Sequence, residues 1–66
     1  MSEIIVEKLL EQRDFYLNTL KHLNFLSIVN SSKNELEEIE KLQTNTVDQL
    51  RNVEQELGSI LSKNQH

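Results

Sequence analysis

Two histidines and an acidic cluster are the residues of this chain best suited to chemistry. A metal site on a helix needs a second ligand three or four residues from the first, and the positions at that spacing around His22 hold Asn, Thr, Phe and Leu. His66 is the last residue and has no such neighbour either. The spacing predicts that His22 is an interfacial or solvated residue and not a metal ligand or a general base.

The acidic cluster consists of Glu37, Glu38 and Glu40, and no nucleophile or base accompanies it. The chain has no cysteine and a single glycine, so it offers neither a thiol nucleophile nor a glycine-rich loop that holds phosphate. A solvated helix face is the usual role of such a run of charges. We therefore expect no catalytic residue, no cofactor, no metal and no small-molecule substrate, and hence no enzyme.

The second half of the chain carries a heptad repeat. Its members are spaced alternately three and four residues apart, which places them in one narrow line along a helix. We call this line the seam; it consists of Leu36, Ile39, Gln43, Thr46, Leu50, Val53, Leu57 and Ile60. A seam of this kind packs against another helix, so we expect helical partners to cover it.

The first half of the chain is apolar on two sides of a predicted helix. The broader stripe is wide enough to face a core and consists of Ile5, Val6, Leu9, Tyr16, Leu17, Leu20 and Leu23. Within it, the candidate interface residues are Leu9, Tyr16, Leu20 and Leu23. A sparser stripe lies nearly opposite and consists of Ile4, Phe15, Leu26 and Val29. A helix that is apolar on two sides usually has a neighbour on each.

A polar run over residues 30–34 separates the two halves. Ser32 followed by Glu35 is typical of a capping box, which begins a helix. We expect one all-α domain over residues 1–66, with a helix over about 2–29, a turn over about 30–34, a helix over about 33–62 and frayed residues 63–66. This is a helical hairpin, and two hairpins that pair into a four-helix bundle or coiled coil would satisfy both apolar stripes.

One continuous coiled-coil helix of roughly 90 Å is the alternative fold. Counting back in sevens from Leu36 gives Val29, His22 and Phe15, so the heptad register of the seam continues along the sparser stripe. The same line also includes polar residues such as Asn18. For that reason we prefer the prediction of a hairpin to that of one continuous helix.

Gln43 and Thr46 interrupt the seam with polar side chains. A buried polar layer can fix the register of a coiled coil at some cost in stability. The other interpretation is that the two residues lie where the helices splay apart. The sequence leaves both open.

Charge limits the partners. The net charge is −4, and residues 35–56 hold seven acidic but only two basic side chains. Such a surface repels phosphate backbones and anionic lipids, so we expect no nucleic-acid binding and no membrane insertion. The absence of cysteine and of a signal-like apolar run fits an intracellular protein, cytoplasmic or nuclear.

The segment from Glu54 to Gly58 resembles the Ser-Gln-Glu-Leu-Asp signature of small helical-hairpin aspartyl-phosphate phosphatases that act on sporulation response regulators. Gly58 stands where that family has its functional Asp, so the resemblance implies no activity here.

The sequence thus predicts a non-catalytic interaction module that self-associates or joins a coiled-coil assembly as a small subunit. The alternative is a small helical regulator that docks on an enzyme or a transcription factor and inhibits it, with the sparser stripe as its docking face. Homo- and hetero-oligomers, and parallel and antiparallel packing, remain open.

Overall fold

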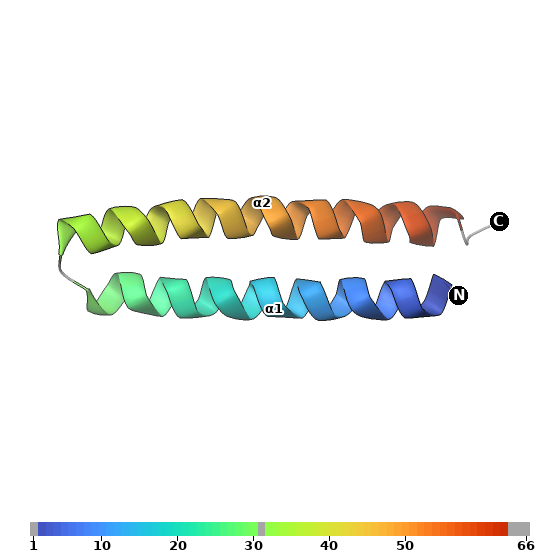
Figure 1. The fold of residues 1–66 in the computed structure, drawn as a ribbon, viewed down its shortest axis with the longest axis horizontal. Helices are drawn as coiled ribbons and strands as arrows, with labels where there is room; N and C mark the ends of the chain where they lie inside the picture. The colour runs from blue at the N-terminus through green and yellow to red at the C-terminus, as the bar shows by residue number, and fades with distance from the viewer. Residues whose placement is uncertain (1, 31, 64–66) are drawn as a thin grey trace.

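Two antiparallel helices make up the regular structure of the residues that are described (Figure 1). The computed structural model describes residues 2–30 and 32–63. Helix α1 spans Ser2–Val29 and helix α2 spans Lys33–Lys63, and the molecule measures 51 × 14 × 13 Å. The predicted all-α helical hairpin is confirmed, and the alternative of one continuous helix is wrong because α2 folds back along α1. The expected fraying concerns Lys63, which ends α2, and residues 64–66, which lie outside the described residues.

Short hydrogen bonds close the helices at the turn. At the end of α1, both the backbone N–H and the side-chain Nδ2 of Asn30 donate to the Leu26 carbonyl, at 3.0 and 2.9 Å. This oxygen is one of the last carbonyls of a helix that have no partner further along it. At the start of α2, the Leu36 N–H donates to the Ser32 carbonyl at 3.0 Å. Ser32 therefore directly precedes α2, but no bond of its hydroxyl to the Glu35 amide accompanies it among the described residues.

The core is a single line of contact between the two helices. Its buried apolar residues are Leu9, Leu23, Ile39, Val53 and Leu57. Because the helices are antiparallel, residues equally far from the turn lie at the same level. The open end of the hairpin thus brings Leu9 together with Val53 and Leu57 in one buried apolar cluster, and Val6 and Ile60 pack against it.

Leu9 and Leu10 allow a matched test of this core. Leu9 is 6% exposed and Leu10 is 36% exposed, although they are the same residue type at neighbouring positions. We expect Leu9→Ala to lower the free energy of unfolding by about 2–4 kcal/mol, because it leaves a cavity in the line of contact. Leu10→Ala should cost less than about 1 kcal/mol. Urea unfolding followed by circular dichroism measures both, and equal losses would contradict this core.

Gly58 lies on the solvated side of α2 and offers a stabilising change. A Cβ built on this residue meets no other atom within 4 Å, and its φ is not positive. Gly58→Ala should therefore raise the free energy of unfolding by about 0.5–1 kcal/mol, because alanine loses less conformational freedom in a helix. The melting temperature reports the gain. An unchanged or lower melting temperature would mean that α2 is not helical at Gly58.

Candidate interaction surface

The seam of α2 is occupied within the chain. Every seam residue is buried or half-buried, and every other residue of α2 from Lys33 to Ser62 is exposed. The helix that covers the seam is α1 of the same molecule (Figure 1). The four candidate interface residues of α1 lie in this same contact, with Leu9 and Leu23 buried and Tyr16 and Leu20 half-buried. The seam therefore needs no second molecule to cover it.

Helix α1 meets the seam with a heptad of its own, part of which the sequence analysis missed. The buried and half-buried positions that follow it are Val6, Leu9, Arg13, Tyr16, Leu20, Leu23, Ser27 and Asn30. Arg13, Ser27 and Asn30 were not predicted because they are polar, and apolar residues on the other sides of α1 hid the repeat. Ile5 and Leu17, which the broad stripe included, are exposed. The spacing of seven residues from Val6 through Arg13 and Leu20 to Ser27 could have revealed this heptad.

The polar layer of the seam is partly satisfied by α2 itself. Thr46 is buried, and its Oγ1 donates to the Leu42 carbonyl at 2.7 Å, one turn earlier in the same helix. Because the hydroxyl has a partner there, it needs none from α1 and places little constraint on register. Gln43 is half-buried.

Arg13 places a buried donor, unpartnered within the described residues, in the contact between the helices. Its guanidinium reaches the neighbouring Asp14 carboxylate only at 4.0 Å, and both side chains are substantially exposed. Its Nε is buried without a hydrogen-bond partner among the described residues. A buried donor that loses water and gains no partner destabilises the folded state.

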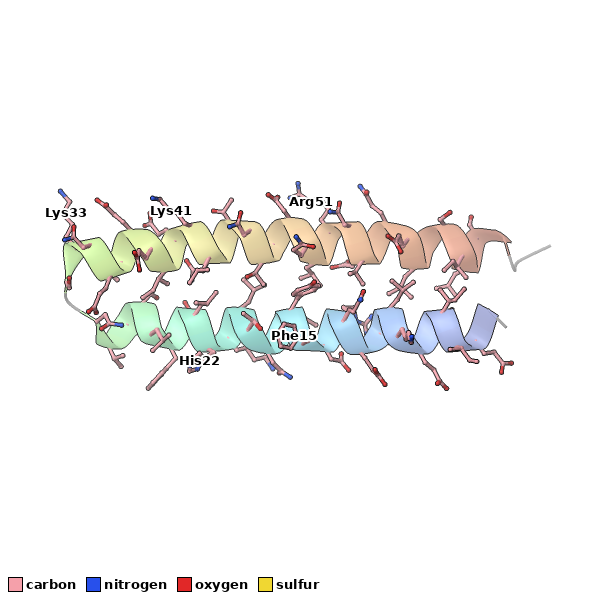
Figure 2. All side chains as sticks on the ribbon, viewed as in Figure 1. Phe15, His22, Lys33, Lys41 and Arg51 are labelled. Carbon is pink, nitrogen blue, oxygen red and sulfur yellow. The ribbon has the colours of Figure 1, made fainter. Side chains whose placement is uncertain are left out.

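A second line of residues follows α1 on the side away from α2, and we call it the outer face. Its members alternate three and four residues apart, as a helix-pairing surface requires. They are Ile4, Lys8, Glu11, Phe15, Asn18, His22, Phe25 and Val29, and all of them are exposed. Figure 2 shows His22 on this side of α1. Both phenylalanines of the chain therefore lie outside the hairpin core.

The outer face and its edge hold the most exposed apolar side chains of the molecule. Their exposed fractions are 74% for Ile28, 64% for Phe15, 63% for Ile4, 58% for Phe25 and 56% for Val29. The Phe15 ring rests edge-on against the half-buried Tyr16, with ring centroids 5.6 Å apart and planes at 67°.

The outer side of α2 is different, because polar residues cover it. Lys33, Lys41 and Arg51 project from this side in Figure 2. The surface depressions along α2 are shallow and open to solvent, and one is lined by Glu37, Glu40, Lys41, Thr44 and Asn45. The exposed apolar side chains of α2 are few and consist of Leu42, Val47 and Leu61. The unpartnered apolar surface of the hairpin thus belongs mainly to α1.

Among the described residues, no group of three acidic or histidine side chains that could hold a metal ion comes together. Across the same residues, neither helix contains a stretch with the length and hydropathy of a membrane span. Comparison of the chain with known protein families, curated proteins and solved structures gives no match.

Replacing Arg13 tests how much this residue lowers the free energy of unfolding. Arg13→Leu should raise the free energy of unfolding by about 1 kcal/mol, because the change removes an unpartnered donor and adds apolar contact with the seam. Arg51→Leu is the matched control, since Arg51 is exposed on the outer side of α2 and should change stability by less than about 0.5 kcal/mol. Urea unfolding compares them. A loss of stability in Arg13→Leu would show that the guanidinium has a favourable partner.

Proposed function

We propose that this chain is a non-catalytic helical interaction module that binds other helices through the outer face of α1. The observation that carries the proposal is the heptad of exposed residues on that face, which includes both phenylalanines. A surface helix with one neighbour normally keeps its opposite side polar, as α2 does. A helix with apolar residues on two opposite sides is typical of the interior of a bundle.

The exposed apolar area is large enough to matter. Ile4, Phe15, Phe25, Ile28 and Val29 are each more than half exposed. At roughly 100 Å² each they present on the order of 500 Å² of apolar surface, whereas a standard interface buries about 800 Å² per partner in all. Polar residues between and beside them supply the remainder. On a typical monomeric protein the largest apolar patch is about 300–600 Å² and is often functional.

The partner class follows from the shape of this surface. The outer face is a straight line of alternating three- and four-residue spacings along a helix, which matches the knobs-into-holes packing of a second helix. It has no pocket for a small molecule and no excess of basic side chains for nucleic acid. A helical hairpin, either another copy or a subunit of a coiled-coil assembly, fits it best.

Two glutamine substitutions test the assignment. Phe15→Gln with Phe25→Gln should reduce a self-associated species to the 7.8 kDa chain in sedimentation equilibrium at tens of micromolar, while helicity persists because neither ring is in the hairpin core. The matched control is Leu42→Gln with Leu61→Gln, two exposed apolar residues of α2, and it should stay associated. Loss of association in the control alone would place the interface on α2 and contradict the proposal.

The second candidate function is a small regulator that docks the same face on an enzyme or a transcription factor. The observation that favours it is the occupied seam, which lets a single hairpin bury its main apolar line without another copy. A wild-type chain that is helical and remains at 7.8 kDa at all concentrations would favour this candidate. A melting temperature that rises with concentration favours the oligomer, because association binds only the folded state.

A further inference from the structure

We propose that the outer face of α1 binds the outer face of α1 in a second copy of this chain. The two helices run antiparallel, and Ile4 of each copy lies level with Val29 of the other. This inference rests on the proposed function, because it names the partner and the register of the same surface. The resulting assembly has two α1 helices at its centre and one α2 helix on each outer side.

The distribution of charge along α1 favours the antiparallel orientation. All the acidic residues of α1 lie in its first half, at Glu3, Glu7, Glu11 and Asp14. From Phe15 to Val29 there is no acidic residue, and this half carries Lys21 and His22. Antiparallel pairing sets the acidic half of one copy against the other half of the second copy. Parallel pairing would set acidic residues against their own copies, which is repulsive.

The two ends of the pairing are apolar. In the proposed register Ile4 packs against the second copy's Val29, and the neighbouring Ile5 packs against its Leu26. Ile4, Ile5 and Val29 are each more than half exposed in the single hairpin, and Leu26 is half-buried. Twofold symmetry repeats these contacts at the other end, so both ends of the helix pair are sealed.

The middle of the pairing combines charge complementarity with an aromatic contact. Glu11 lies level with the second copy's His22, and Asp14 lies beside its Lys21. The two Phe15 rings flank the twofold axis, offset by only about 4.5 Å along the helix direction, which is three residues at 1.5 Å each. Aromatic rings at such a separation attract each other in edge-to-face or offset geometry. Each Phe15 ring also contacts Tyr16 of its own chain edge-on.

A register shifted by one heptad is the strongest competitor. It would pair Phe15 with the second copy's Phe25, which is favourable. However, it would set Lys21 against its own copy near the axis and would leave Ile4 beyond the contact. The proposed register covers the whole outer face and has no such like-charge pair. Charge repulsion therefore favours it over the shifted register.

Disulfide trapping tests orientation and register, because the natural chain has no cysteine. Ile4→Cys and Val29→Cys are made separately and mixed in a glutathione redox buffer, and the disulfide products are identified by mass. We expect the mixed disulfide, which joins position 4 of one copy to position 29 of the other, to exceed either homodimeric disulfide by about tenfold or more, because pairing raises the effective concentration of these two thiols alone. In a parallel pair the two positions would be about 38 Å apart, so the mixed product reports antiparallel pairing.

Three further outcomes would overturn the inference. Homodimeric disulfides of Ile4→Cys and of Val29→Cys in excess would mean parallel pairing. A preference of Val29→Cys for Glu11→Cys over Ile4→Cys would mean the shifted register. Either result leaves the proposed function intact if the phenylalanine variants still abolish association. Statistical mixing of all disulfides in a chain that stays monomeric would remove the second copy as the partner.

A charge exchange checks the same register without cysteine. Asp14→Lys alone and Lys21→Asp alone should each weaken dimerisation several-fold, because each creates a like-charge contact between copies. The double variant Asp14→Lys with Lys21→Asp should restore most of the affinity. The two residues are seven apart on one helix, so they cannot restore each other within a chain. Additive loss in the double variant would contradict the pairing.

Discussion

The continuous contact between α1 and α2 is the constraint on which the rest of the molecule depends. Each helix contributes a line only one or two side chains wide, and the five buried apolar residues all lie in it. So thin a core leaves little margin against the conformational entropy of about 60 ordered residues. It also uses up the seam of α2, so any further association must use another surface. Outside this contact, the most exposed apolar side chains among the described residues lie on the outer face of α1 and its edge.

The two helices differ in how their polar and apolar residues are distributed between the contact and the solvent. Helix α2 is amphipathic in the simple sense, with its seam against α1 and polar residues over most of its remaining surface. Helix α1 carries polar residues where it meets α2, at Arg13 and Ser27, with Asn30 directly after its end, and apolar ones where it faces solvent. Stability is thus given up on the inner side of α1 while apolar area is kept on the outer side. A helix with this distribution is suited to the centre of a larger assembly.

The heptad of α2 correctly predicted which side of that helix is buried, because its seam is strict and its other sides are mostly polar. The pattern in α1 was harder to read, since burial there follows spacing and not polarity. Arg13 occupies a core position and Phe15 an exposed one, and hydrophobicity alone assigns both wrongly. The sequence also could not tell that the seam is covered by the same chain, because a heptad specifies that a helix must pack and not which helix it meets. Its sparser stripe nevertheless contained Ile4, Phe15 and Val29 of the outer face.

Sedimentation equilibrium of the unmodified chain over a wide range of concentration tests the central claim most directly. If the seam is satisfied within one hairpin and the outer face pairs with one second copy, the mass should rise from 7.8 kDa to twice that value and stop there. Helicity should change little across the range, because the hairpin precedes the dimer. A mass that stays at 7.8 kDa, or one that climbs through larger oligomers, would contradict the account.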